Sequence, residues 1–482
     1  MTGWVIDGEH ITLYAAIFLV VELLAIFAAL RAVMTARTAQ GAVAWAIALV
    51  TLPWVTLPLY AVFGGRKFYG YRIARRSGDA DIRALARRIE GQFTPALRPE
   101  LTEQRGRFAA LERLAAMPFL GGNDARLLIN GEATFGAILE AIGQARDYVL
   151  LEFYIVHDDG IGRALHTALL ECRKRGVRVF FIYDPIGSHD LPLSYVESLR
   201  DAGARVEPFL STRNPLRRLQ LNFRNHRKIV VIDGGLAYVG GHNVGDEYLG
   251  CVPALSPWRD THIEVRGPAA GAVQLAFLED WNWAAREIPE LHWRAETVER
   301  RDLPVLVVPS GPADELDTCS LFFTHVISSA RRRLWISSPY FVPDEPVVAA
   351  LHLAALRGAD VRILLPGRPD HRSVYLAGIS FIEEMRGSGV RMFRYKQGFL
   401  HQKVVLCDDV AVVGTANLDN RSFRLNFEIS LLVADAQFAG EVADMLARDF
   451  EQSREVDAAA LARISLPVRV ASRAARLFSP VL

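Results

Sequence analysis

The sequence predicts an α/β protein of two related halves, preceded by an N-terminal two-helix transmembrane hairpin. Three observations lead to this fold class. A histidine–lysine motif occurs twice, helices and strands are expected in the same order around each copy, and the N-terminal region contains two long apolar stretches. Helix–strand alternation is typical of a layered α/β domain, and its repetition indicates two domains related by a pseudo-twofold axis.

The composition excludes several classes of protein. The 482 residues carry a net charge of +1, so attraction to anionic partners must come from local patches. The four cysteines show no C-x-x-C spacing and no cluster with histidines, which argues against a disulfide framework and a structural zinc site. No P-loop or dinucleotide fingerprint occurs, so a nucleotide-driven reaction has no support.

Two apolar stretches, residues 11–30 and 42–63, reach the roughly 20 residues that a helix needs to cross a bilayer. Glu22 is the only charge in the first stretch, and the second has none. A cleaved signal peptide and buried core helices are the alternatives. However, no Lys or Arg precedes the first stretch, and the second follows at once. Pro53 and Pro58 would kink the second helix, which membrane helices tolerate. We therefore expect a transmembrane hairpin over residues 1–76.

Basic residues predict how this hairpin is oriented. The short loop between the stretches carries Arg31 and Arg37, whereas five basic residues follow the second stretch: Arg66, Lys67, Arg72, Arg75 and Arg76. Basic residues accumulate on the cytoplasmic side of a membrane. We therefore expect a multi-pass protein of the cell (inner) membrane with cytoplasmic catalytic domains. A helical connector over residues 77–124 would join the hairpin to these domains.

The predicted alternation begins near residue 126. Strands are expected over 148–156, 177–183 and 205–209, with helices over 161–175 and 195–202 between them. The second half repeats this order: residues 334–342 correspond to 149–156, and residues 381–396 align without a gap on 195–210. These matches predict a first domain over 125–283, a linker over 284–304 and a second domain over 305–455.

Each half contains one copy of an H-x-K-x4-D motif. The first copy contains His226, Lys228 and Asp233, and the second contains His401, Lys403 and Asp408. Residues two apart share one face of a strand, so the histidine and lysine of each copy project together. The aspartates fall where each strand ends and off that face, so we count them among the catalytic residues in an orienting and not a reacting role. A glycine turn with an amide follows each copy, at Asn243 and Asn417.

An imidazole, an ammonium and an amide that converge on one point suit an anionic oxygen cluster such as a phosphodiester. A single H-x-K on a strand is usually a surface pair, but the duplication together with the two downstream turns favours a catalytic site. Two such sets imply two histidines that share one phosphate. Both motifs can reach that phosphate only across the interface between the halves.

The paired motifs resemble the signature of the phospholipase D superfamily, two H-x-K-x4-D copies each followed by G-[GS]-x-N. Thr415 is a mild departure from that pattern. Gly245-Asp246-Glu247-Tyr248 after the first motif and Asn417–Phe423 after the second are similar to the bacterial cardiolipin synthases of the superfamily, as is the N-terminal hairpin. With these features the resemblance extends over nearly the whole chain.

The resemblance implies a two-step reaction through a phosphohistidine. One histidine attacks phosphorus and the other passes a proton to the leaving oxygen; by similarity to family members, His226 is the expected nucleophile. Lys228, Asn243, Lys403 and Asn417 would bind the substrate phosphate. Because the lysines supply the positive charge, we expect no metal and no cofactor.

The expected function is transfer of a phosphatidyl group from one phosphatidylglycerol to another, with release of glycerol. The expected partners are phosphatidylglycerol and an anionic lipid bilayer. Nucleic acid is not expected, because a nuclease would favour a broadly basic chain. A hydrolytic phospholipase D or another phosphatidyltransferase at the membrane is the alternative. A catalytically silent scaffold is disfavoured, because the histidine and lysine of both motifs are intact.

Two further segments have two interpretations each. The insertion over residues 211–224 is rich in arginine and would form either a rim for anionic headgroups or a solvated loop. The tail over residues 456–482 mixes arginines with apolar residues. It predicts an amphipathic helix that lies on the membrane surface or packs on the catalytic domain.

Overall fold

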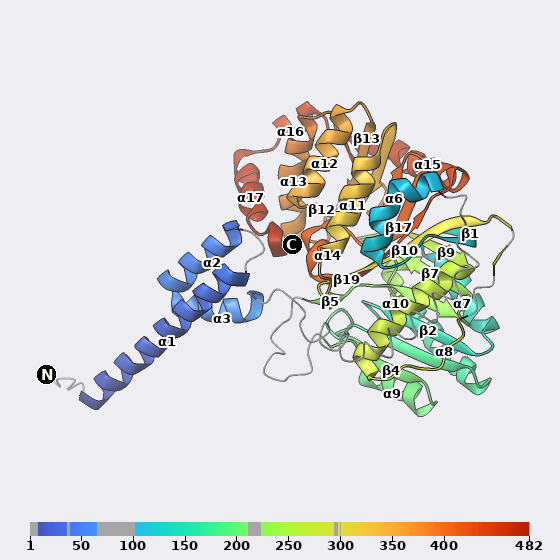
Figure 1. The fold of residues 1–482 in the computed structure, drawn as a ribbon, viewed down its shortest axis with the longest axis horizontal. Helices are drawn as coiled ribbons and strands as arrows, with labels where there is room; N and C mark the ends of the chain where they lie inside the picture. Colours follow the sequence, from blue (N-terminus) through green and yellow to red (C-terminus); the bar gives the residue numbers. More distant parts are fainter. Residues whose placement is uncertain are drawn as a thin grey trace. The chain divides into compact units, whose positions relative to one another are not determined.

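The computed structural model describes residues 8–35, 39–64, 102–210, 223–293, 297–298 and 300–481. The chain divides into an N-terminal helical unit and a larger unit that contains both halves of the α/β portion (Figure 1). Several predicted features lie outside the described residues. These are Arg37, the five basic residues between 66 and 76, residues 77–101 of the connector and residues 211–222 of the arginine-rich insertion.

The helical unit begins with α1, Gly8–Thr35. Residues 12–35 of this helix have a mean hydropathy of 2.6, enough by length and composition to cross a membrane. The second apolar stretch is not one helix, because α2, Ala39–Thr51, ends before α3, Pro53–Phe63. Leu52 leaves the helical conformation with φ −135° and ψ 55°. Pro53 has no N–H to continue the helix, so the proline predicted to kink this segment divides it.

Small residues bring the helices of this unit together. Ala28, Ala29 and Ala32 of α1 are buried with Leu49 of α2. Alanines at such a contact let two helix backbones approach closely, which is the usual way in which apolar helices associate in a membrane.

The larger unit is built on one continuous sheet of 16 strands that runs through both halves. The strands of the first half are β1 Leu120–Ile129, β2 Tyr148–Phe153, β3 Arg178–Tyr183, β4 Arg205–Pro208, β5 Arg224–Asn225, β6 Ile229–Ile232, β7 Leu236–Gly240, β8 Trp258–Arg259 and β9 Thr261–Arg266. The strands of the second half are β10 Leu303–Ser310, β11 Arg333–Ser337, β12 Phe341–Val342, β13 Asp360–Pro366, β14 Arg391–Tyr395, β15 Phe399–Leu400, β16 Val404–Cys407, β17 Val410–Gly414, β18 Leu418–Asp419, β19 Asn426–Val433 and β20 Ser453–Glu455.

The strand order displays the predicted repeat. From the centre outward, the first half runs β1-β9-β7-β6-β2-β3-β4 and the second runs β10-β19-β17-β16-β11-β13-β14. The two halves join where β1 pairs antiparallel with β10. The seven strands from β1 to β4 on this path therefore have counterparts from β10 to β14, and the motif strands β6 and β16 occupy equivalent places. β20 extends the second half beyond β14.

Helices cover both faces of this sheet (Figure 1). In the first half they are α7 Asn130–Gln144, α8 Gly160–Lys174, α9 Leu193–Asp201 and α10 Pro268–Ala285, with a 3-10 turn η4 at Asp246–Leu249. In the second half they are α11 Thr318–Ser329, α12 Glu345–Leu356, α13 Arg372–Arg386, α14 Asn420–Arg424, α15 Ala436–Glu451, α16 Ala458–Ala462 and α17 Leu466–Arg476, with a final turn η5 at Ser479–Val481. The helices and strands predicted between residues 148 and 209 are present, with bounds shifted by one to three residues.

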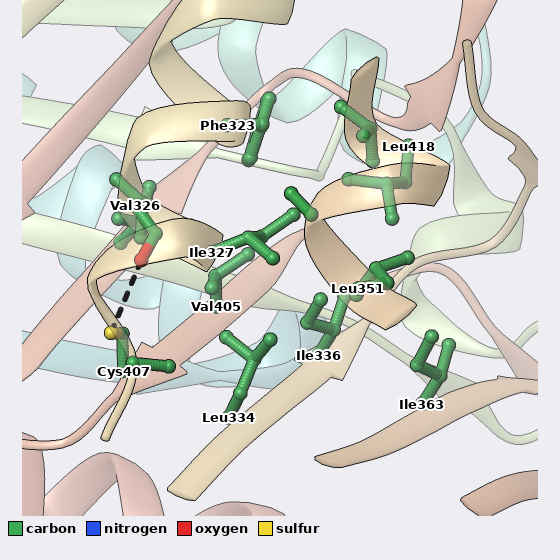
Figure 2. Packing of buried hydrophobic residues seen from close by; sticks show 14 of the residues in the cluster. Phe323, Val326, Ile327, Leu334, Ile336, Leu351, Ile363, Val405, Cys407 and Leu418 are labelled. Atoms are coloured by element: carbon green, nitrogen blue, oxygen red, sulfur yellow. Dashed lines mark hydrogen bonds between the residues drawn. The ribbon is translucent and has the colours of Figure 1, made fainter. Parts of the chain in front are cut away.

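The core of the second half lies between this sheet and α11 and α12. Figure 2 shows Phe323, Val326 and Ile327 of α11 in one buried cluster with Leu334 and Ile336 of β11. The thiol of Cys407 donates a hydrogen bond to the carbonyl oxygen of Val326 at 3.3 Å, which ties the end of β16 to α11. Val405 and Cys407 belong to this cluster, so the second motif strand packs directly on the core.

The described part of the predicted connector belongs to this same core. Helix α6, Thr102–Ala115, buries Phe108 and Leu111 against residues of the second half. β1 then begins at Leu120 and enters the sheet of the first half. The chain therefore contacts the second half before it builds the first.

Candidate active site

The two motif segments meet at the interface between the halves, as the sequence requires for a shared phosphate. Just before the first motif, β5 pairs in parallel with β19 of the second half. Just before the second motif, β15 pairs in parallel with β8 of the first half. The backbone N–H of His226 donates to the carbonyl of Phe427 at 3.0 Å, and that of His401 to the carbonyl of Arg259 at 2.8 Å. Each half thus fixes the backbone of the other half's histidine.

A carboxylate from the opposite half orients each histidine ring. His226 Nδ1 lies 2.9 and 3.0 Å from the two carboxylate oxygens of Glu428, which is 202 residues away in the chain. His401 Nδ1 lies 2.8 Å from Oδ2 of Asp260. Since Nδ1 is engaged in both rings, Nε2 is the nitrogen left to act on a substrate.

The motif lysines lie beside their own histidines. Lys228 Nζ donates to the carbonyl oxygen of His226 at 2.7 Å. Lys403 Nζ lies 3.0 Å from His401 Nδ1 and 3.1 Å from His401 Nε2. Both lysines are buried, so their charge acts on the site with little screening by solvent.

Burial and the lysines together disfavour protonated histidines in the free site. Burial, with Lys228 and Lys403 beside it, holds the pKa of His226 well below its usual range. Burial and Lys403 lower the pKa of His401 to about 4, although Asp260 opposes this. Burial also lowers the pKa of Lys228 to about 7 and that of Lys403 to about 8. A bound anion would relieve this crowding of positive charge, so the site suits a phosphate.

The two orienting carboxylates differ in their ionisation. Burial raises the pKa of Glu428 to about 7, in spite of Lys228 nearby. Burial acts in the same direction on Asp260, but His242, Lys403 and His401 outweigh it and hold its pKa well below the usual range. Asp260 is therefore ionised at neutral pH, whereas the pKa of Glu428 lies close to neutral pH.

The two predicted asparagines differ in their hydrogen bonds. Asn243 donates from Nδ2 to the hydroxyl of Tyr248 at 2.7 Å and accepts from the backbone N–H of Ile155 at 3.2 Å. The Oδ1 atom of Asn417 is buried, and no hydrogen-bond partner for it occurs within the described parts of the chain.

Asp233 and Asp408 lie away from the histidines, at the far ends of the motif strands. Asp233 accepts hydrogen bonds from three successive backbone N–H groups, those of Arg146, Asp147 and Tyr148, at 2.8–2.9 Å. Asp408 accepts from Arg331, Arg332 and Arg333 in the same way at 2.9–3.0 Å. Both aspartates adopt a positive φ in the turn after the strand. They hold the first residues of β2 and β11 in register and contact neither histidine, so the orienting role inferred from their parity acts on the backbone.

The sequence reasoning assigned no role to Glu428 or Asp260. One signal was available: Glu428 is the only acid in β19, a strand that is buried along its whole length, and a carboxylate is rarely buried in such a strand without a partner. Thr415, the departure from the family pattern, belongs to the same set. Its hydroxyl donates to Glu428 Oε2 at 2.6 Å.

A pair of buried histidines extends the site in the first half. His242 Nδ1 and His262 Nδ1 lie 3.0 Å apart, so one ring donates to the other. The register places His262 opposite Gly240, whereas Ser430 lies opposite Gly414 in the second half. Within the described residues, the pair therefore occurs in the half that provides Asp260 and not in the other. Burial lowers the pKa of His242 to about 4.

Behind the motifs, each half buries one arginine–aspartate ion pair. Arg227, the middle residue of the first motif, pairs with Asp280 of α10 at 2.7 Å. In the second motif that position is Gln402, and Arg259 of the first half pairs with Asp449 of α15 at 2.7 Å. Gln402 donates to the same aspartate at 2.8 Å. A buried arginine therefore lies behind both motifs, and the first half supplies both of them.

No group of three or more His, Cys, Asp or Glu side chains in the described ranges is arranged to hold a metal ion. The arrangement that is present can perform acid–base and nucleophilic chemistry. It consists of two imidazoles whose Nδ1 atoms face carboxylates, two buried lysines and a boundary of buried polar residues; Lys403 Nζ lies 3.1 Å from His401 Nε2.

Comparisons with known proteins point to one family. A family profile described as "Cardiolipin synthase, PLD-like domain" matches residues 138–252 and 323–453, and one described as "Phospholipase_D-nuclease N-terminal" matches residues 23–65. The chain is 51% identical over 465 residues to cardiolipin synthase A of Pseudomonas putida, with 96% of each chain covered. It is 49% identical over 478 residues to cardiolipin synthase A of Pseudomonas fluorescens, with 98% of this chain and 99% of the relative covered.

Among solved structures, the chain is similar to phosphatidylserine synthase of Haemophilus influenzae Rd KW20. The TM-score is 0.59 at 15% sequence identity, and the match covers 78% of this chain and 100% of the other. At that identity the likeness concerns the fold alone.

Proposed function

Because this chain belongs to the cardiolipin synthase family of the phospholipase D superfamily, we propose that it transfers a phosphatidyl group from one phosphatidylglycerol to another and releases glycerol. The observation that carries the proposal is the reciprocal pair His226–Glu428 and His401–Asp260. Each pair takes one member from each half, so one site contains two oriented histidines.

In the first step, His226 Nε2 attacks the phosphorus of the donor lipid. The bond between phosphorus and the glycerol oxygen breaks, and His401 gives its Nε2 proton to that oxygen, so glycerol leaves. In the second step, a glycerol hydroxyl of the acceptor lipid gives its proton to His401 and attacks phosphorus. The phosphorus–nitrogen bond breaks and cardiolipin leaves. Two steps through a covalent adduct lower the barrier of each.

The different carboxylates support this division of labour. The ionised Asp260 beside His401 Nδ1 stabilises the imidazolium form that His401 must have before it donates its proton, and the negative phosphate of the substrate adds to this. Glu428 accepts from Thr415 and Ser422 as well as facing His226, so its charge is shared among several donors. It can hold His226 as the neutral tautomer with a proton on Nδ1, which leaves the Nε2 lone pair free to attack.

Lys228 and Lys403 would bind the phosphate oxygens and stabilise the charge that develops on them, with Asn417 as a further donor. In a buried site, each preorganised donor of this kind contributes about 2–4 kcal/mol to transition-state stabilisation. Asn243 would act through Tyr248, to which its amide is hydrogen-bonded.

We also propose the finer organisation that the sequence predicts. Residues 1–76 would form a membrane hairpin in which α1 spans the bilayer and α2 and α3 form the return segment. Residues 125–283 and 305–455 would be the two catalytic domains, on the cytoplasmic side. Exchange of one phosphodiester for another needs no activated donor, so anionic lipid in the bilayer would provide both substrates.

The test supplies the purified, vesicle-reconstituted protein with phosphatidylglycerol labelled in its terminal glycerol. We expect free labelled glycerol and cardiolipin in equal amounts. Phosphatidic acid as the main lipid product would mean that water is the acceptor, and the proposal would be replaced by a hydrolytic phospholipase D.

A further inference from the structure

In the C-terminal helix α17, arginines face the protein and several apolar side chains face solvent. Residues 458–482 contain four arginines, at positions 463, 469, 473 and 476, and no acid. A helix on the surface of a domain normally buries its apolar face and exposes its charged face. In α17 much of this arrangement is reversed.

The arginines of α17 hold it against α13 of the second half. Arg469 and Arg473 lie 3.4 and 3.1 Å from the carboxylate of Glu383. Arg476 lies 2.6 Å from Glu384, and its guanidinium stands 4.2 Å over the centre of the Phe381 ring. Small residues fill the contact, since Ser472 is buried and Ala475 packs against the core.

The apolar side chains of α17 point to solvent. Leu466 and Val470 of the helix and Leu477, its C-cap residue, are 73%, 59% and 80% exposed. Their spacing of four and seven residues places them in one row along the helix. Phe478, just beyond the helix, is 62% exposed and extends the row. Arg473 lies in the same row but turns toward Glu383, and its side chain is still 60% exposed.

We propose that this row, Leu466, Val470, Leu477 and Phe478, docks α17 on the surface of an anionic lipid bilayer. An apolar strip bordered by half-exposed arginines is the pattern of a helix that lies in the membrane interface. The arginines complement anionic headgroups, and the absence of an acid in the segment removes any repulsion from them. The proposal depends on membrane attachment of the chain and not on the chemistry at His226 and His401.

A second copy of the chain is the competing occupant of this face. The row contains no acid to pair with the exposed arginines of another α17, so self-association would bring like charges together. A bilayer satisfies both the apolar row and its arginine border, whereas a second α17 satisfies only the row. The chain also carries α1, which is apolar enough to bring it to a membrane.

The test uses the full chain with Cys251, the exposed one of the four cysteines, replaced by serine. One cysteine is then introduced, by Val470→Cys or Leu477→Cys, and it carries an environment-sensitive nitrobenzoxadiazole probe. The three buried native cysteines stay in place. The protein is reconstituted into phosphatidylcholine vesicles with or without phosphatidylserine. Leu193→Cys, at an apolar residue of the first half that is 64% exposed, is the matched control.

With anionic vesicles we expect a blue shift of the emission at positions 470 and 477, and quenching by nitroxide-labelled lipids. At position 193 we expect neither effect. Arg469→Gln with Arg473→Gln should weaken the quenching. Three results would overturn the proposal: equal emission at 470 and 193, quenching that does not depend on anionic lipid, or cross-linking between copies at 470 without quenching. Cardiolipin synthesis measured in the same vesicles separates this result from the fate of the proposed function.

Discussion

The carboxylate that holds His401 and the one that holds His226 differ in length, in partners and in pKa. Asp260 lies against Gly241, where an added Cβ would approach its Oδ1 within 2.0 Å. Glu428 lies instead beside Thr415, which donates a hydrogen bond to it. His242 and His262 extend the first setting, whereas Ser430 occupies the place of His262 in the second. A duplicated fold thus gives two histidines equal positions and unequal environments.

This difference explains how a pseudo-symmetric site can catalyse an asymmetric reaction. One histidine must begin neutral and the other must deliver a proton, and identical surroundings would give both the same protonation state. When two titratable groups lie in environments that give them different pKa values, one can act as the acid and the other as the base or nucleophile. The following experiments test whether the two half-sites differ in this way.

The largest effect is expected from the histidines. His226→Ala and His401→Ala should each reduce cardiolipin synthesis by a factor of at least about 10⁴, because both act in the same steps. A phosphatidyl ester of p-nitrophenol needs no acid to leave, so it should restore a burst of nitrophenolate in His401→Ala alone. A burst in His226→Ala would exchange the two roles.

Glu428→Gln should reduce kcat by about 10³–10⁴, because an amide can donate to Nδ1 and move the proton of His226 to Nε2. Asp260→Asn should cost about 10²–10⁴, the usual worth of an acid–base group. Only Asp260→Asn should be relieved by the nitrophenyl substrate. Equal relief of both variants would remove the distinction between the carboxylates.

The pH dependence should report Glu428. Its pKa is raised to about 7 and its ionised form is required, so kcat/KM should fall as the pH drops through that value. Lys228 and Lys403, with pKa values lowered to about 7 and about 8, should produce a decline at higher pH. Thr415→Val removes a donor to the carboxylate and should move the acidic limb to higher pH. Thr134→Val, a buried threonine of α7, is the control and should leave the limb in place.

The ion pairs behind the motifs should affect stability more evenly. Asp280→Ala and Asp449→Ala each leave a buried arginine without its carboxylate, which costs about 3–5 kcal/mol of unfolding free energy. Denaturant unfolding of the full chain in detergent would measure this. A loss of unfolding free energy in only one of the two variants would show that Arg227 and Arg259 are not equivalent.

The smallest effect is expected at the motif aspartates. Asp233→Ala and Asp408→Ala remove hydrogen bonds to three backbone N–H groups and should destabilise the protein by about 1–3 kcal/mol. Since neither side chain contacts a histidine, kcat of the folded fraction should be retained. A loss of kcat without loss of stability would return these residues to the catalytic group.

Much of this arrangement could be predicted from the sequence because it depends on patterns of residues that are close together in the chain. The repeated H-x-K-x4-D motif, the buried strands that follow His226 and His401, and the helix–strand order all depend on neighbouring residues. The pairing of His226 with Glu428 could not be derived this way, since 202 residues separate them and only the parallel contact of β5 with β19 brings them together. Pro53 predicts a kink, but the complete break at Leu52 could not be derived from the sequence, because membrane helices can also accommodate a proline without ending.

The most direct test of the two unequal half-sites is to trap the covalent intermediate. The protein is mixed with phosphatidylglycerol labelled in the phosphatidyl group, quenched during turnover, digested, and mapped by mass spectrometry. We predict a phosphatidyl adduct on His226 and none on His401. An adduct on His401 would contradict the assignment of nucleophile and acid, and turnover without any histidine adduct would contradict the two-step mechanism itself.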